Sequence, residues 1–187
     1  MSTQAKKDIQ FFSPQQAAQQ TAEIVYGAVE TAFGLCWAAL FNHALCALVF
    51  ARDALEIEQS LHRVWPKSQQ KPLPKNDPLL STVVQAVLSD EKVPLVLVGT
   101  DFQQAIWQTL LKVPLGARIS YQSLAKKAKK PAAIRAAASA VAANKIAVAV
   151  PCHRVIRSSG DVGQYRWGTD LKRQLLVMEG CDISLRA

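Results

Sequence analysis

Three short apolar runs in the first third of the chain constrain its fold more than any other feature of the sequence. These strand-length runs span residues 24–30, 35–41 and 44–50. Asn42-His43 separates the last two runs and suits a tight turn between antiparallel strands. We therefore expect a small sheet, and we expect Cys36 and Cys46 to lie buried and inert in its strands.

The rest of the first half predicts helices packed on this sheet. Residues 53–65 and 79–88 have apolar side chains at helical spacing, and Asp53 can cap the first of these helices. The polar, proline-rich residues 67–78 are typical of a connector. Residues 93–98 form an apolar strand, which Pro94 should restrict to an edge of the sheet. We expect residues 1–22 to form a loose segment with at most a short helix after Pro14.

The second half of the sequence predicts helices. The first predicted helix spans residues 102–112, with Trp107 on the face that packs against the core. Ser120 is a good N-cap for a second helix over residues 121–128. Pro131 suits the first turn of a third helix that runs to about Ala143. The last two, joined by a short basic turn, form a helix-turn-helix pattern. We expect an α/β domain over residues 1–100 and a mainly α domain over 101–187.

Charge separates the two halves as clearly as the secondary-structure pattern does. The formal net charge is +8. Residues 1–100 carry 8 Lys and Arg against 9 Asp and Glu, whereas residues 101–187 carry 14 against 5, a net +9. A basic half of this kind favours a polyanionic partner such as nucleic acid, although basic residues are also common on a merely solvated surface.

Composition indicates a folded protein in a reducing compartment. No apolar run reaches the ~20 residues that a membrane helix needs, and Met1 to Gln10 lacks the apolar core of a signal peptide. We therefore expect a cytoplasmic protein whose four cysteines are reduced. Their spacing matches no zinc site, and we expect neither a metal nor a cofactor.

The strongest chemical signal is Pro151-Cys152-His153-Arg154, which follows the apolar run 146–150. Cysteine attacks as a thiolate, and an adjacent imidazole can take its proton. Pro151 should hold the thiol at a rigid strand-to-turn edge, and we expect Arg154 and Arg157 to favour the thiolate. The alternative is a buried structural cysteine, which is what most free cysteines are.

Several motifs, in a fixed order, resemble the O6-alkylguanine-DNA alkyltransferase family, most of all the alkyltransferase half of the bacterial Ada-type proteins. The similarity extends from about Phe102 to Glu179. It rests on Ile119-Ser120-Tyr121-Gln122, Arg135, Asn144, Pro151-Cys152-His153-Arg154-Val155, Ser158-Ser159-Gly160 and Tyr165-Arg166-Trp167-Gly168. It departs at Lys145, where the family often has proline. The resemblance implies a ribonuclease-H-like first domain and a winged-helix second domain.

The resemblance also implies a role for each matching residue. Catalysis would fall to Cys152, His153, Glu179, Asn144 and Tyr121. DNA binding would fall to Arg135, Tyr121, Gln122 and Ser158. Residues 160–168 would form the lid of the substrate pocket. The pocket and lid residues would be Val155, Ser159, Tyr165 and Trp167. The alanine-rich third helix, with Arg135 as its long projecting side chain, suits close approach to a minor groove without base readout.

The implied activity is single-turnover DNA repair. The family moves the alkyl group of O6-alkylguanine, and by the same chemistry O4-alkylthymine, from duplex DNA to its own cysteine. We expect a monomer, with cooperativity on DNA left open. Two alternatives are a helix-turn-helix lesion sensor or regulator without chemistry, and a cysteine hydrolase. Lesion sensors of this kind lack the cysteine that is present here. A hydrolase would need a histidine from elsewhere in the chain, and no oxyanion-hole motif is evident.

Overall fold

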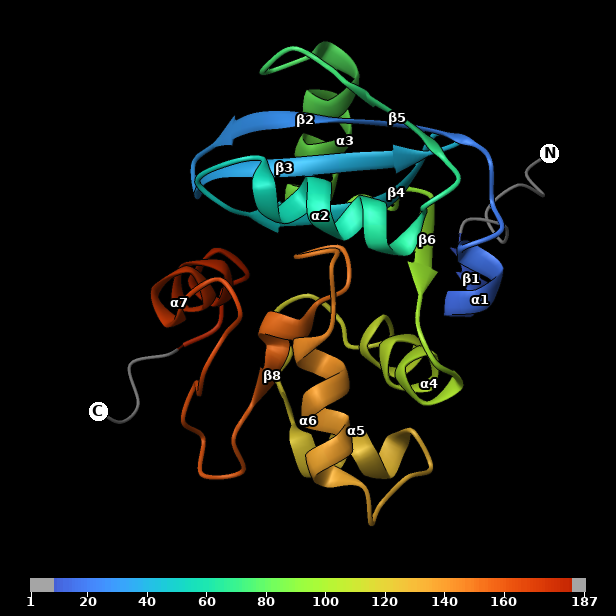
Figure 1. Cartoon of the computed structure of the whole chain (residues 1–187). Coiled ribbons are helices and arrows are strands. Elements are labelled where there is room, and N and C mark those ends of the chain that lie inside the picture. Colours follow the sequence, from blue (N-terminus) through green and yellow to red (C-terminus); the bar gives the residue numbers. More distant parts are fainter. Residues whose placement is uncertain (1–8, 183–187) are drawn as a thin grey trace, which may run out of the picture. The chain divides into compact units, whose positions relative to one another are not determined.

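The structure is a computed structural model that describes residues 9–182 of the chain. It has a mixed α/β architecture and divides into two compact units, which meet between Asp101 and Phe102. Figure 1 shows the course of the chain through both. None of the helices in the described part is long and apolar enough to cross a membrane.

A six-stranded sheet forms the first unit, in the order β1-β6-β4-β3-β2-β5. The strands are β1 (Ile9–Phe12), β2 (Glu23–Thr31), β3 (Gly34–Phe41), β4 (Ala44–Phe50), β5 (Gln69–Pro72) and β6 (Leu95–Val98). β2, β3 and β4 pair antiparallel, and the three short strands pair parallel to their neighbours. The three predicted strands are confirmed. Asn42 and His43 both have positive φ, which is the conformation of a two-residue hairpin turn.

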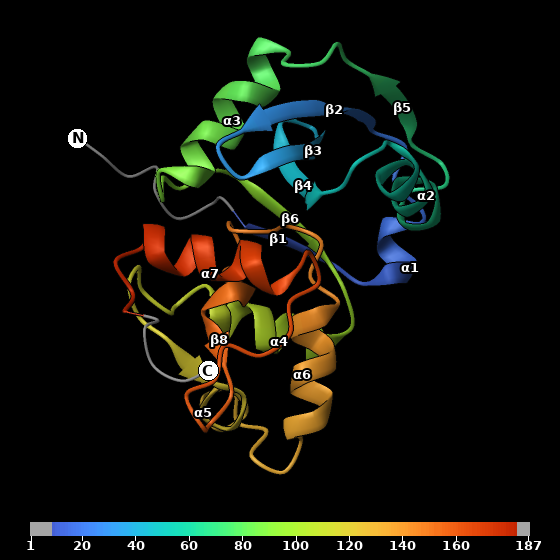
Figure 2. The same cartoon turned by 90° about the vertical axis from the view of Figure 1, so that its left-hand side faces the viewer.

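Helices cover both faces of this sheet. α2 (Leu55–Val64) and α3 (Pro78–Leu88) lie on opposite faces, as the two views in Figures 1 and 2 show. Both predicted helices are confirmed, and the carboxylate of Asp53 accepts a hydrogen bond from the amide of Leu55 at 3.0 Å. Cys36 and Cys46 are buried in β3 and β4, where burial raises the pKa of each thiol to about 12.

Three predictions for the first unit are wrong. β6 is an interior strand, because Pro94 stands just before it and the β4 amide of Leu45 donates to the Pro94 carbonyl at 2.8 Å. The segment predicted to be loose supplies strand β1, whereas the short helix expected after Pro14 is confirmed as α1 (Pro14–Ala17), with its capping box at Ser13; residues 1–8 lie outside the described residues. The predicted connector contains β5, which pairs with β2.

The second unit is helical around one small parallel pair of strands. Its helices are α4 (Asp101–Leu110), α5 (Tyr121–Lys127), α6 (Ile134–Ala142) and α7 (Thr169–Met178). Ser120 caps α5 by accepting a hydrogen bond from the Ser123 amide at 3.1 Å, as predicted. Trp107 of α4 is buried, and its indole donates to the Ala140 carbonyl of α6 at 2.8 Å. Pro131 lies in the turn before α6, so that helix begins three residues later than predicted.

The strand pair ties the start of α5 to the segment that carries the cysteine. β7 (Ile119–Ser120) ends where α5 begins, and β8 (Val155–Ile156) follows a single 3-10 turn over Cys152–Arg154. Ile119 pairs with Val155, and Ser120 pairs with Ile156. The Tyr121 end of α5 is therefore held beside the Cys152 segment by backbone hydrogen bonds.

Candidate active site

Asn144 organises the backbone that leads to the cysteine. It is buried at the end of α6, and its Oδ1 accepts a hydrogen bond from the Ile146 amide at 2.9 Å. Its Nδ2 donates to the carbonyls of Ile146 and Val150, and to Cys152 Sγ, each at 3.1 Å. One side chain therefore fixes both ends of the loop and the sulfur atom itself.

That loop is tightly turned, which corrects the prediction of a strand leading to the thiol. Val148 has a φ of 64°, a left-handed conformation that is strained for a β-branched residue. The Ala149 amide donates to the Ala147 carbonyl at 2.7 Å, and the Cys152 amide donates to the Val150 carbonyl at 2.7 Å. The chain thus makes two tight turns before the 3-10 turn of Cys152. Asn144, rather than a strand, gives this segment its rigidity.

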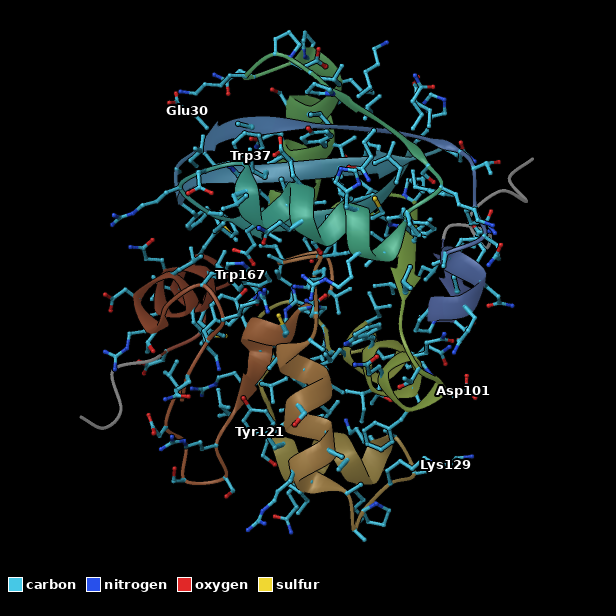
Figure 3. All side chains as sticks on the ribbon, viewed as in Figure 1. Glu30, Trp37, Asp101, Tyr121, Lys129 and Trp167 are labelled. Carbon is cyan, nitrogen blue, oxygen red and sulfur yellow. The ribbon has the colours of Figure 1, made fainter. Side chains whose placement is uncertain are left out.

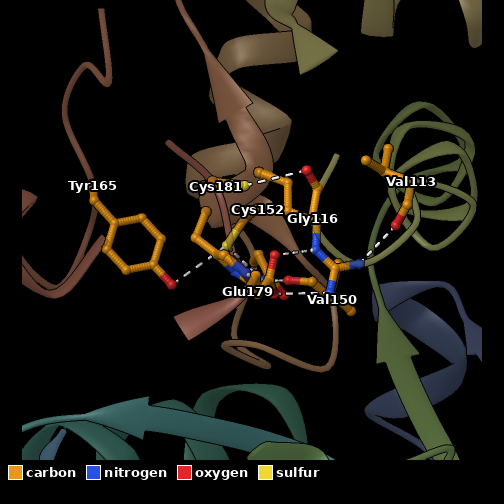
Figure 4. A network of polar contacts seen from close by, with 10 residues as sticks. Val113, Gly116, Val150, Cys152, Tyr165, Glu179 and Cys181 are labelled. Atoms are coloured by element: carbon orange, nitrogen blue, oxygen red, sulfur yellow. Dashed lines mark hydrogen bonds and ion pairs between the residues drawn. The ribbon is translucent and has the colours of Figure 1, made fainter. Parts of the chain in front are cut away.

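Cys152 is buried, with hydrogen-bonding groups around its sulfur. Burial raises the pKa of the thiol, while the hydrogen bond from Asn144, the nearby Tyr165 hydroxyl and the charge of Lys172 act to lower it. Tyr165 Oη lies 4.0 Å from Sγ (Figure 4). An amide N–H that points at sulfur stabilises the charged form, so the Asn144 hydrogen bond offsets part of the cost of burial, which remains the largest effect on the pKa of the thiol.

His153 is a neutral base that is anchored by a carboxylate. Its Nε2 lies 2.7 Å from Glu179 Oε1, and burial lowers the pKa of the imidazole despite the opposing effect of that carboxylate. Since Glu179 accepts, Nε2 must carry the proton, and Nδ1 is left with its lone pair. Nδ1 is buried and has no hydrogen-bond partner within residues 9–182. The tautomer is therefore the one that can accept a proton at Nδ1.

Glu179 reaches this position because α7 ends directly after Met178. Gly180 has a φ of 75°, and the Gly180 and Cys181 amides donate to the carbonyls of Val177 and Leu176 at 2.9 Å each. This left-handed cap, which favours glycine, turns the chain immediately after Glu179. Burial acts to raise the pKa of Glu179, but the hydrogen bonds from His153 and Arg154 outweigh it and lower that pKa to about 2.

The two arginines that the sequence suggested as thiolate-stabilising cations are each paired with a carboxylate. Arg154 donates from Nε to Glu179 Oε2 at 2.9 Å and from Nη2 to Oε1 at 2.8 Å, and its Nη1 bonds the Val113 carbonyl at 2.7 Å. Arg157 is exposed and pairs with Asp161 at 3.0 Å. The cation whose charge lowers the thiol pKa is instead Lys172 of α7, which sequence reasoning missed.

The remaining predicted residues fall into two groups. Tyr165 lies near the sulfur, Val155 is buried in β8, and Trp167 packs edge-on against Tyr165 with ring centroids 5.2 Å apart. Tyr121 is the first residue of α5, where burial and the neighbouring Cys152 raise its pKa (Figure 3 labels Tyr121 and Trp167). The other group is exposed on the second unit and comprises Gln122, Arg135, Ser158 and Ser159.

The arrangement as a whole is a nucleophile with a base beside it. Cys152 supplies the sulfur, His153 supplies a proton acceptor, and Glu179 fixes the imidazole in the required tautomer. Cys181 lies outside this group, with its thiol 3.3 Å from the Gly116 carbonyl. No cluster of three His, Cys, Asp or Glu side chains in residues 9–182 is arranged to hold a metal ion.

The sequence is similar to proteins that act on methylated DNA. Residues 101–181 match the family profile described as "6-O-methylguanine DNA methyltransferase, DNA binding domain". The bifunctional transcriptional activator/DNA repair enzyme Ada of Escherichia coli is 38% identical over 158 residues, which cover 82% of this chain. The chain spans only 45% of that relative's length. The methylated-DNA–protein-cysteine methyltransferase of Mycobacterium leprae is 37% identical, with 65% of this chain and 77% of that protein covered.

Two solved structures are similar to most of this chain. The crystal structure of Mycobacterium tuberculosis OGT in complex with DNA has a TM-score of 0.68 and 31% identity, and the match covers 83% of this chain and 92% of that one. The structure of the O6-methylguanine methyltransferase of the same organism has a TM-score of 0.69 and 32% identity over the same shares of the two chains.

Proposed function

Because the chain belongs to the methylated-DNA–protein-cysteine methyltransferase family, we propose that it repairs O6-alkylguanine in duplex DNA by moving the alkyl group to Cys152. The observation that carries this proposal is the sulfur that Asn144 holds at 3.1 Å, with the carboxylate-anchored His153 as the adjacent residue. O4-alkylthymine is a second substrate of the same chemistry. No metal or cofactor is required.

The first step brings the lesion to the sulfur. The O6 atom of a stacked guanine lies at the major-groove edge, so the nucleotide must rotate out of the helix, at a cost of a few kcal/mol that is smaller for a damaged base. In this proposal α6 enters the minor groove and Arg135 fills the gap. Tyr121 presses on the neighbouring phosphate, and Gln122 and Ser158 contact the backbone. The exposure of Arg135 on the alanine-rich α6 supports this role.

The second step is a proton transfer followed by a displacement. His153 Nδ1 takes the Cys152 proton through a water molecule, and Glu179 stabilises the imidazolium that results. The thiolate then attacks the alkyl carbon in line, so that an S–C bond forms as the C–O6 bond breaks. The electron pair of that bond stays with the guanine, which regains a proton from Tyr121. Val155, Ser159, Tyr165 and Trp167 line the pocket.

The product explains why each chain would act once. An S-alkyl thioether carries no good leaving group, so no group in the site restores the thiol. We propose that the second unit, with its winged helix-turn-helix, contains all of this chemistry, and that the first unit is a ribonuclease-H-like domain without chemistry of its own. The protein would act as a cytoplasmic monomer.

A repair assay tests the proposal. A duplex with one O6-methylguanine is mixed with limiting protein, and the remaining lesion is counted by digestion and chromatography. The amount repaired should stop at one lesion per chain. Cys152→Ala should repair none, whereas the matched control Cys181→Ala, which changes a buried thiol outside the site, should repair as much as the unmodified protein. Binding of the damaged duplex without loss of the methyl group would indicate the lesion sensor instead.

A further inference from the structure

Lys172 is a fully buried lysine that the reaction proposed above does not use. Lys172 is only 1% exposed, and its Nζ donates hydrogen bonds to the carbonyls of Val155 in β8 at 2.6 Å and Val162 at 2.7 Å. Buried lysines are rare unless their charge is balanced. Within residues 9–182, no carboxylate lies at ion-pair distance from this ammonium, although two carbonyls fix its position.

Among the charged groups that the structure describes around the sulfur, Lys172 is the cation without a carboxylate at ion-pair distance. Glu179 is balanced by Arg154, and Asp161 pairs with Arg157 at the surface. Burial lowers the pKa of His153, which favours its neutral form. The ionisable groups whose charges act on Lys172 are Cys152, Asp161 and Arg157, and Lys172 in turn acts on His153. The buried group that can supply the missing negative charge is therefore the Cys152 thiol.

We propose that Lys172 is a positioning residue whose ammonium, held by the carbonyls of Val155 and Val162, is the counter-charge of the Cys152 thiolate. The proposal rests on the function proposed above, and it specifies what stabilises the buried thiolate once His153 has taken its proton. The coupling acts in both directions, as linkage requires. Burial lowers the pKa of Lys172 to about 8, and the charge of Cys152 opposes that shift.

The coupling has a consequence for the alkylated protein. A thioether sulfur is neutral, so alkyl transfer removes the counter-charge and leaves the ammonium unbalanced in a buried site. The pKa of Lys172 should then fall, because desolvation is no longer opposed by the thiolate. The ammonium also fastens the 157–168 segment to β8 through Val162 and Val155, so the same event weakens that connection.

The ionisation of Cys152 can be measured without DNA, which separates this proposal from the repair function. The rate of carbamidomethylation of Cys152 by iodoacetamide is followed from pH 5 to 11 by mass spectrometry of the peptide that contains it. In Lys172→Met the midpoint should rise by about one pH unit or more, which slows the reaction about tenfold near neutral pH. Lys172→Arg should restore most of the rate. Arg173→Met, at the exposed neighbouring position of α7, should leave the profile unchanged.

A folded Lys172→Met protein with an unchanged midpoint would overturn the proposal, whatever the repair assay shows. If Lys172→Met does not fold, the coupling is measured from the other side in protein with labelled lysine side chains. NMR titration should then give a lower Lys172 pKa in Cys152→Ser, whose hydroxyl stays neutral, than in the unmodified protein. Equal lysine pKa values in these two proteins would overturn the proposal as well.

Discussion

Glu179 determines what the imidazole beside the cysteine can do. It accepts from His153 Nε2 and takes two hydrogen bonds from Arg154, so it is a fully satisfied buried carboxylate. If it were removed, the proton on His153 could occupy either ring nitrogen, and the guanidinium of Arg154 would remain buried without its partner. The same carboxylate therefore supports both the tautomer of the base and the folded state.

The free energy of unfolding at acid pH should depend on the ionisation of Glu179. The pKa of Glu179 is lowered to about 2 in the folded protein, so the stability that it contributes is complete above the ordinary value of 4.5 and is lost as the pH falls toward 2. The contribution is at most about 3 kcal/mol. We expect Glu179→Gln to be less stable at pH 7 and to lose less stability in this pH window, as measured by urea unfolding. Identical pH dependence in the two proteins would contradict this role for Glu179.

Single residues were predictable from sequence only where a local motif marks them. Pro151-Cys152-His153 indicated the proposed nucleophile and its neighbour, whereas Glu179 was indicated only by the family resemblance. Lys172 was missed, because a lysine among polar helix residues is usually exposed. The available signal was spacing: Lys172 falls on the helical stripe of Leu175, Leu176 and Glu179, all of which are buried.

The segment between β8 and α7 is the element that controls access to the sulfur in this account. Tyr165 lies beside Sγ, and Trp167 packs edge-on against Tyr165. The backbone of this segment is held by the hydrogen bond from Lys172 to the Val162 carbonyl, and the Arg157–Asp161 ion pair holds it as well. An aromatic pair held in this way should leave little room for a bulky adduct.

Selectivity between adducts tests the role of that segment. We expect the unmodified protein to transfer methyl groups faster than benzyl groups, and Trp167→Gly to reduce the difference between their rates about tenfold, because an indole side chain no longer narrows the entrance. Rates are measured under single-turnover conditions with duplexes that carry either adduct. Equal rates for the two adducts in the unmodified protein would show that Trp167 does not restrict the site.

Helices and strands were predictable where a local residue pattern marks them. Strands that depend on hydrogen-bond partners far away in the sequence were not predictable. The β2–β4 meander, α2, α3 and the Ser120 cap follow from spacing and turn residues. β1 and β5 are short polar or mixed strands whose hydrogen bonds go to β6 and β2, and nothing local indicates those partners. Pro94 shows the opposite error, because its ring stands outside the ladder and does not restrict β6 to an edge.

Net charge is the property of the whole molecule that bears on its partner. The excess of 14 basic over 5 acidic residues in 101–187 coincides with the unit that holds the cysteine, and the first unit is nearly neutral. Neutralised phosphates release counterions, which gives affinity for any duplex and suits repair at guanines in any sequence. The sequence therefore indicated a polyanionic partner before any site was known.

Arg135 should affect repair more than binding. Arg135→Ala removes one cation, so affinity for undamaged duplex should fall modestly, and its salt dependence should decrease by about 0.9 in logarithmic slope if that cation neutralises one phosphate. Methyl transfer should slow by about tenfold or more, equivalent to about 1.4 kcal/mol, because the gap left by the flipped nucleotide is no longer filled. Arg63→Ala, an exposed helical arginine of the first unit, is the matched control. Equal loss of binding and transfer would argue against gap filling.

The most direct test of the central claim is to locate the transferred group. Intact-mass and peptide mass spectrometry of the protein, after exposure to excess duplex with O6-methylguanine, should show one added methyl group per chain, on the sulfur of Cys152. Methyl groups on another residue would contradict the account. So would repair of more lesions than there are protein chains while Cys152 stays unmodified.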